Sequence, residues 1–340
     1  MGAAVHAEGA GPGYRVVAAW PASRKVVVCV MTLKQRAASA AYRLGWLAVR
    51  RVPEPWARWV FRQIADILWR RQGKGVRQLE ANLRRVVPGA TGKQLRQLSR
   101  AGMRSYLRYF MEAFRLPVMS RERIVSGMCV AGEEQTALAH LRAARGVIFA
   151  LPHAGNIDVA AVWIMTRGAG PVSTVAERLK PESLFDQFVA FRESLGIEVV
   201  PHTGGPSPFE VMAQRLRAGR LICLIADRDL GRGGVEVELF GEKARVAAGP
   251  AALAVQVGAA LMPVVLWFEG DGWRGHIHPE IPAPEHGTRE QKVAAMSQQL
   301  AAVWAAGIAD HPQDWHMLQK VFVADLDAAR LSAQSVATGG

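Results

Sequence analysis

From about residue 127 onward, short apolar runs alternate with segments of helical periodicity. The runs expected to form strands are 147–151, 171–176, 197–200, 221–226 and 261–268, and the alternation over 235–240 predicts an exposed strand. The segments expected to form helices are 133–144, 158–165, 182–194, 208–218, 249–257 and 288–307. Continuous apolar strands that alternate with helices are typical of a parallel sheet covered on both sides. The pattern therefore predicts an α/β fold, with a mostly parallel sheet and helices on both faces.

The segment from Met31 to Leu116 has helical periodicity throughout. Pro53 and Pro55 mark the start of a helix whose apolar positions share one face. These positions are Trp56, Val60, Ile64 and Ile67 or Leu68, and most of the nearby arginines lie elsewhere on the helix. The face fits either an ordinary surface helix packed on a core or an interfacial helix, with aromatic residues at the lipid headgroups and arginines on phosphates. We expect an N-terminal helical, membrane-associating region in front of the α/β core.

These patterns divide the chain into four parts. Residues 1–30 are rich in Gly and Ala and lack periodicity, which indicates a disordered or mis-assigned extension with Met31 as an alternative start. Residues 31–125 form the helical region, residues 126–325 the α/β core, and residues 326–340 a flexible tail.

The formal net charge is +13, which favours polyanionic partners such as nucleic acid, an anionic membrane surface or phosphorylated ligands. No run of uninterrupted apolar residues is long enough to predict a transmembrane helix. The three cysteines have neither metal-site spacing nor the pattern of a disulfide framework, so we expect a reducing, cytosol-facing location.

His153 follows the apolar run 147–151 directly, and Asp158 lies five positions further on. This arrangement predicts a base at the carboxyl end of a strand and a carboxylate on the first turn of the next helix. Such a pair suits removal of a proton from an alcohol that then attacks an acyl group. The spacing alone also fits a histidine with a purely structural role.

Other expected strands end in charged residues as well. Glu177 and Arg178 follow the strand 171–176, and the group Asp227, Arg228 and Asp229 follows the strand 221–226. Because parallel strands end at one edge of a sheet, we expect these groups to lie near His153.

The roles expected of these groups follow from their chemistry. Asp158 or Asp227 would hold the imidazole, while Arg178, Arg192 and Arg228 would bind phosphates. The helix that begins at Gly249 would offer free N–H groups to an anion or oxyanion. The alternative for each acid–arginine pair is a structural salt bridge.

Several mechanisms lack their motifs. The sequence has no Gly-x-Ser-x-Gly elbow, no phosphate-binding Gly-x4-Gly-Lys-Ser/Thr loop, no His-Glu-x-x-His or Cys-x-x-Cys pair, and no early Gly-x-Gly-x-x-Gly. We therefore expect no metal and no bound cofactor. A base without an evident nucleophile favours direct transfer without a covalent acyl-enzyme.

Together the motifs resemble the bacterial lipid A biosynthesis acyltransferase family. The resemblance covers roughly residues 31–320 and depends on the order of 77–83 (RQLEANL), 151–158 (LPHAGNID), 226–229 (ADRD), 240–242 (FGE) and 248–250 (AGP). Within this family, the segments that look like the phosphatidylinositol mannoside acyltransferases are 176–181 (AERLKP), 191–196 (FRESLG) and 268–273 (FEGDGW).

The resemblance implies a peripheral enzyme on the cytoplasmic face of the cell membrane. It would move a long, palmitoyl-type acyl chain from acyl-CoA to a mannose hydroxyl of a phosphatidylinositol mannoside. The family's His–acid dyad would fall on His153 and Asp227, with Asp158 in support. Asp227 stands where close relatives are expected to carry Glu, so the partner of His153 stays open between Asp227 and Asp158. Arg192 and Gln256 resemble donor-contacting positions.

Three alternatives remain at this point. The first is an acyltransferase on lipid A precursors that uses acyl carrier protein. The second is a basic nucleic-acid-binding protein, although the aromatic residues concentrate in an amphipathic helix and no nucleic acid is expected. The third is a membrane scaffold without catalytic activity.

Overall fold

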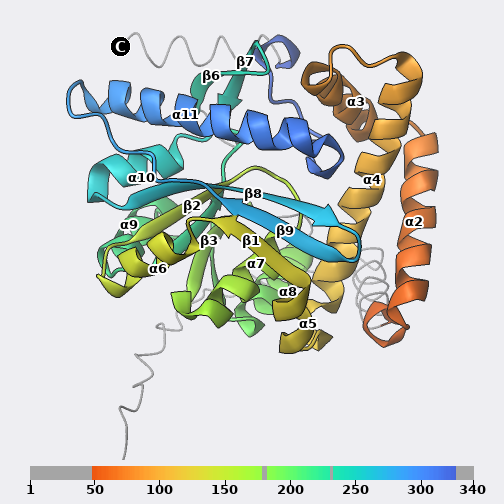
Figure 1. Cartoon of the computed structure of the whole chain (residues 1–340), viewed down its shortest axis with the longest axis horizontal. Coiled ribbons are helices and arrows are strands. Elements are labelled where there is room, and N and C mark those ends of the chain that lie inside the picture. The colour runs from red at the N-terminus through yellow and green to blue at the C-terminus, as the bar shows by residue number, and fades with distance from the viewer. Residues whose placement is uncertain (1–47, 178–181, 230–232, 327–340) are drawn as a thin grey trace, which may run out of the picture.

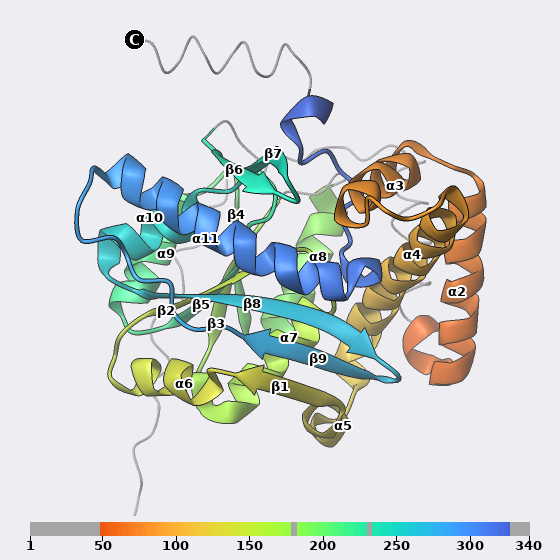
Figure 2. The ribbon, with the colours of Figure 1, turned by 45° about the horizontal axis from the view of Figure 1, so that its top comes forward.

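The computed structural model describes residues 48–177, 182–229 and 233–326. A central sheet lies between two layers of helices, and N-terminal helices pack against one end of it (Figure 1). Figure 2 shows the long helix α11 crossing one face of the sheet while α7 and α8 lie beneath the other. The predicted extension 1–30 and tail 326–340 lie outside the described residues except for residue 326.

Within the described residues the main sheet has seven strands in the order β1-β9-β8-β2-β5-β3-β4. The neighbours β8, β2, β5, β3 and β4 are parallel, whereas β9 runs antiparallel to β8 and pairs in parallel with β1. The strands are β1 (Met128–Gly132), β2 (Val147–Leu151), β3 (Val172–Ala176), β4 (Ile197–Pro201), β5 (Leu221–Ile225), β8 (Ala260–Glu269) and β9 (Gly272–Ile277). The prediction of a mostly parallel sheet is confirmed.

Strand β2 separates two hydrophobic cores because its side chains alternate between the two faces of the sheet. Ile148 and Ala150 pack in one core, and Val147, Phe149 and Leu151 pack in the other. The first core is covered by α9 (Pro208–Arg217), α10 (Gly249–Val257) and α11 (Arg289–Asp310). The second is covered by α5 (Arg121–Gly127), α6 (Glu134–Arg142), α7 (Ile157–Ile164) and α8 (Glu182–Ser194). Helices on both faces are thus confirmed.

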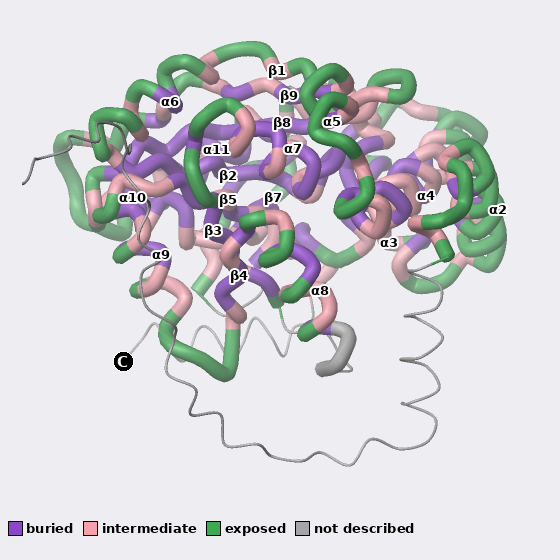
Figure 3. The backbone as a smooth tube through the Cα atoms, turned by 90° about the horizontal axis from the view of Figure 1, so that it is seen from below, coloured by how far each residue is buried: buried purple, intermediate pink, exposed green. Residues whose placement is uncertain are grey.

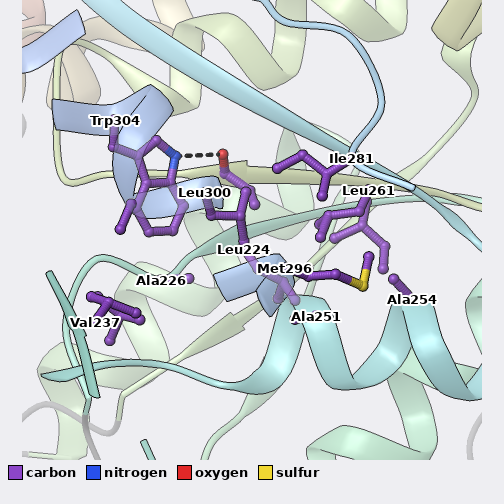
Figure 4. Close-up of a cluster of buried hydrophobic side chains, with 14 of the residues drawn as sticks. Leu224, Ala226, Val237, Ala251, Ala254, Leu261, Ile281, Met296, Leu300 and Trp304 are labelled. Atoms are coloured by element: carbon purple, nitrogen blue, oxygen red, sulfur yellow. Dashed lines mark hydrogen bonds between the residues drawn. The ribbon is translucent and has the colours of Figure 1, made fainter. Parts of the chain in front are cut away.

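The first core also satisfies its buried polar groups. In the close-up of Figure 4, Trp304 of α11 lies beside Leu300 and above the sheet. Its indole N–H donates a hydrogen bond of 3.1 Å to the backbone oxygen of Ala150. A buried N–H without such a partner would destabilise the fold, so this bond fixes α11 against β2.

The N-terminal helices are α2 (Glu54–Arg70), α3 (Lys74–Val86) and α4 (Gly92–Arg115), and they share a small core of their own. The predicted start of α2 beside Pro53 is confirmed. Thr91 and Gln94 form a capping box at the start of α4. Asp66 of α2 accepts hydrogen bonds from both Arg100 and Arg104 of α4, which hold the pKa of its carboxyl well below the ordinary range.

Three strands were not predicted from the sequence: β1, β9 and β7 (Glu242–Val246), the antiparallel partner of β6 (Val235–Leu239). Their residues are partly exposed and include glycine, arginine and glutamate, so they lack a continuous apolar run. No helix among the described residues is long and apolar enough to span a bilayer. The predicted division between residues 125 and 126 stays a prediction.

Candidate active site

His153 and Asp227 lie side by side where β2 and β5 end. His153 Nδ1 is 2.5 Å from Asp227 Oδ1, and the His153 backbone N–H donates to Asp227 Oδ2 at 3.0 Å. Because an ionised carboxylate only accepts, Nδ1 carries the ring proton and Nε2 keeps its lone pair. The His153 side chain is 32% exposed and Asp227 is 1% exposed. The ring can therefore meet a substrate while its partner stays behind it.

The Asp227 carboxyl has a lowered pKa despite its position. Burial alone raises the pKa, but the charge of His153 and hydrogen bonds from His153 and Trp315 outweigh burial. Asp227 consequently stays ionised and stabilises the imidazolium that forms when His153 takes a proton.

The loop after β2 turns sharply to bring His153 to the sheet edge. Gly155 has φ +58°, and a Cβ there would lie 2.7–2.8 Å from backbone and side-chain atoms of Leu266 and from the backbone of Trp267, so only glycine fits. Asn156 caps α7 by accepting from the Val159 N–H, and its amide donates to the buried Glu112 of α4. Glycine at position 155 is thus required by packing and by the turn.

Asp158 does not contact His153. It lies on the first turn of α7 and is buried, with Arg192 Nε at 2.7 Å and the Tyr109 hydroxyl at 2.9 Å. Burial and the Asp158 charge raise the pKa of Tyr109, which keeps this hydroxyl protonated. The question that the sequence left open is answered in geometry: Asp227 holds the ring, and Asp158 pairs with Arg192.

The remaining predicted groups are more scattered. Glu177 is exposed and accepts from Arg228 Nη2 at 3.3 Å. Asp229 is buried beside Arg245 of β7, with 3.7 Å between Oδ2 and Nε. Arg178 lies outside the described residues.

The two predicted site residues on α10, Gly249 and Gln256, lie at opposite ends of the helix. Backbone hydrogen bonds from Ala226 to Leu151 and from Ala247 to Ala226 bring the start of α10 beside the ends of β2 and β5. Gly249 begins this helix, and a Cβ there would meet nothing within 4 Å, so the space around it is open. Gln256 lies in the last turn, is exposed and accepts from Arg289. The structure does not bring Gln256 to His153.

An apolar cavity of about 650 Å³, open space at its mouth included, lies between the sheet and α7. Leu151 and Ile225, each two residues before a member of the His153–Asp227 pair, line it. Its other sheet residues include Phe149, Val172, Thr174, Cys223, Val264 and Leu266, and its helix residues include Ile157, Ala160, Ala161, Trp163 and Ile164. Asp158 and Arg192 also line it, so the cavity adjoins the candidate site. Among the described residues, no three His, Cys, Asp or Glu side chains are grouped to hold a metal ion.

Residues 31–323 match the family model of bacterial lipid A biosynthesis acyltransferases. The chain belongs to this family. It is 49% identical over 290 residues to a phosphatidylinositol mannoside acyltransferase of Mycolicibacterium smegmatis. The matched region covers 85% of this chain and 92% of the relative. A protein of the same name from Mycobacterium tuberculosis is 46% identical over 292 residues, 85% of this chain and 90% of the relative. The protein is thus an acyltransferase.

Sequence reasoning on this acyltransferase missed the segment that follows α11. Residues 312–314 form a short 3-10 helix, after which Trp315 pairs with Ala154 in an isolated β-bridge. The His316 N–H donates to the His153 backbone oxygen at 2.7 Å, and the Trp315 indole donates to Asp227 Oδ2 at 2.8 Å. The segment has no apolar periodicity, and only its aromatic and histidine residues mark it in the sequence.

His316 should make folding stability depend on pH. Burial, followed by the charge of His153, lowers its pKa to about 3, and its Nε2 lies 2.8 Å from Ser105 Oγ. Below about pH 6.5, His316 is protonated in the unfolded chain but stays neutral in the folded chain. The free energy of unfolding therefore decreases as the pH falls from 6.5 toward 3, by up to about 1.4 kcal/mol per pH unit. Urea unfolding of wild type and His316→Gln at several pH values measures the slope, which should be smaller in the variant. Equal slopes would contradict a neutral buried His316.

Proposed function

We propose that this acyltransferase moves a long, palmitoyl-type chain from acyl-CoA to a mannose hydroxyl of a phosphatidylinositol mannoside, with His153 as general base. The observation that carries the proposal is the partly exposed imidazole on a buried carboxylate, next to an apolar cavity. The acceptor is proposed from the names of the relatives, which cover 85% of this chain.

The geometry supports a single-step transfer. His153 Nε2 makes no hydrogen bond with any described residue, so it is available to a substrate hydroxyl. It takes the hydroxyl proton as the oxygen attacks the thioester carbonyl, the C–S bond breaks, and the proton passes from the imidazolium to the leaving thiolate. The thioester is already activated, so no covalent acyl-enzyme is needed. Asp227 stabilises the imidazolium throughout.

The start of α10 is suited to the negative charge that forms on the carbonyl oxygen. The helix begins at Gly249 beside the end of β5, and its N-cap residue, Ala248, makes no side-chain hydrogen bond to it. Free N–H groups and the helix dipole stabilise an oxyanion at such a position. This is the role that we propose for Gly249.

The acyl chain is proposed to lie in the apolar cavity. Its walls are mostly Leu, Ile, Val, Ala and aromatic side chains, which suit a hydrocarbon chain. Since the cavity adjoins Leu151 and Ile225, a chain inside it would present its thioester near His153. Arg192 and Asp158, in its wall, would support the site as a buried ion pair.

A membrane surface on the cytoplasmic side of the cell membrane is the proposed location of the reaction. Trp56 and Trp59 are 64% and 57% exposed on α2. They belong to an exposed apolar face that also includes Val60, Ile64, Ile67 and Leu68. We call this set the α2 face. Much of the α2 backbone is coloured as exposed in Figure 3. An apolar face flanked by arginines fits the boundary between headgroups and acyl chains.

A second hollow, beside α2, is lined by arginines that would favour an anionic membrane surface. Four arginines line it, two from α2 and two from α4: Arg58, Arg62, Arg104 and Arg108. Three of them have acidic partners, whereas Arg62 makes no ion pair with any described residue. Lipid phosphates at the headgroup level would meet this charge.

Replacement of Trp56 and Trp59 by Ser tests the membrane part of the proposal. Each tryptophan loses a large apolar surface, so binding to vesicles of phosphatidylcholine and phosphatidylinositol should weaken by at least about tenfold. Cosedimentation measures the binding. Val118→Ser, which changes an exposed apolar residue outside the α2 face, should leave it unchanged. Equal sedimentation of the double variant and wild type would exclude the α2 face as the contact.

The donor and acceptor are tested together by transfer assays. The purified enzyme is offered palmitoyl-CoA or palmitoyl acyl carrier protein, each with phosphatidylinositol mannoside or a lipid A precursor. We expect product only from palmitoyl-CoA with phosphatidylinositol mannoside. The family description favours the lipid A precursor as the second candidate, and product from that acceptor with acyl carrier protein would replace the proposal.

A further inference from the structure

We propose that Trp315 is a positioning residue for the transfer reaction: its indole N–H fixes the Asp227 carboxylate in the orientation that holds the His153 ring. The inference rests on the proposed function, because it assigns Trp315 a task only if His153 is the base. It concerns a residue that lies 88 positions from Asp227 along the chain.

The hydrogen bonds at the carboxylate divide between its two oxygens. Oδ1 accepts a hydrogen bond from His153 Nδ1 at 2.5 Å. Oδ2 accepts from the His153 backbone N–H at 3.0 Å and from the Trp315 indole N–H at 2.8 Å. Two donors on Oδ2 prevent the carboxylate from rotating about its Cβ–Cγ bond. Oδ1 consequently stays directed at Nδ1.

Trp315 itself is held on several sides. It is fully buried, and the Phe240 ring lies 5.9 Å from it between ring centres. The bridge to Ala154 and the bond from His316 to the His153 oxygen attach the same segment to the backbone of the base. The indole of Trp315 and the imidazole of His153 are therefore held by backbone segments that are bonded to each other, as a positioning role requires.

The segment is also fixed from its other side. Ser105 of α4 donates to Asp314 Oδ1 at 2.5 Å, and the Phe268 N–H donates to Asp314 Oδ2 at 3.0 Å. Gly155 N–H donates to the Asp314 backbone oxygen at 3.1 Å. These contacts leave little freedom for the backbone that carries Trp315.

Two described histidines interact electrostatically with Asp227. They are His153 and His316, and His316 is neutral because burial lowers its pKa to about 3. The indole stabilises the lone carboxylate more than it stabilises the carboxylate paired with an imidazolium. Loss of the indole N–H should thus make the resting dyad easier to protonate, which moves the acid limb of the rate profile to higher pH.

Trp315→Phe tests this inference, with Trp304→Phe as the matched control. Both tryptophans are buried, and both donate one indole hydrogen bond, but Trp304 donates to the Ala150 backbone. For Trp315→Phe we expect kcat/KM to fall about tenfold and the acid limb to rise by roughly 0.5–1 pH unit, while the donor KM changes less than about twofold. Trp304→Phe should leave the acid limb in place.

A second measurement needs no folded variant at Trp315. In wild type labelled with ¹⁵N-tryptophan, one indole N–H resonance should shift as the dyad titrates, and Asp227→Asn should abolish that shift. The inference is overturned if Trp315→Phe keeps the wild-type pH profile or if no indole resonance follows the dyad. If His153→Ala keeps full activity, the proposed function fails instead, so the two failures are distinguishable.

Discussion

His153→Ala should lower kcat/KM for acyl transfer by about 10²–10⁴-fold, the range that general bases contribute. The imidazole has a free lone pair and a buried, ionised partner, and it lies two residues beyond Leu151, which lines the apolar cavity. Without it the sugar hydroxyl must lose its proton to water. Transfer of radiolabelled palmitate to phosphatidylinositol mannoside measures the loss.

His140→Ala is the control for this experiment. His140 is also partly buried beside a carboxylate, Glu280, but it lies on α6 near the start of β2, at the far edge of the sheet. Its replacement should leave transfer unchanged. Urea unfolding should show that His153→Ala folds, and wild-type turnover in that folded variant would refute the mechanism.

Arg192→Met should be the most destabilising single change that we predict, at about 3–5 kcal/mol. Arg192 and Asp158 are both buried, with 2.7 Å between Nε and Oδ1. Removal of the guanidinium leaves a buried carboxylate whose remaining side-chain donor among the described residues is the Tyr109 hydroxyl. Urea denaturation gives the free energy of unfolding.

Two further variants make the stability test specific. Arg215→Met breaks an ion pair with Glu198 that is partly exposed, so it should cost about 1 kcal/mol or less. Asp158→Asn added to Arg192→Met removes the unpaired charge and should restore part of the lost stability. A loss equal to that of Arg215→Met would mean that the Asp158 carboxylate is solvated after all.

The core of the fold was predictable because β2 and β5 are apolar on both faces and end abruptly in polar residues. β9 was not, since its residues Gly272, Arg274 and Gly275 interrupt any apolar alternation. The pairing of β9 with β8 depends on tertiary contacts, which local sequence patterns do not predict. Caps such as Thr91 were predictable because the interaction is local.

The candidate site was also predictable in part. His153 and Asp227 could be placed at one sheet edge from topology alone. The His-x4-Asp spacing also suggested Asp158 as a direct partner, but the turn at Gly155 and the cap at Asn156 place Asp158 on α7 beside Arg192. Trp315 and His316 lie in a segment without apolar periodicity, and their roles arise only when the segment after α11 packs against the end of β2.

The bridge between Ala154 and Trp315 has a consequence for biosynthesis. A ribosome has produced His153 and Asp227, the two members of the dyad, well before residue 315 emerges. Until then the histidine backbone lacks its hydrogen bond from His316, and the aspartate lacks its indole donor. Fragments that end just before residue 314 should be inactive although they contain every described strand of the sheet, so premature termination would not release a partly active enzyme.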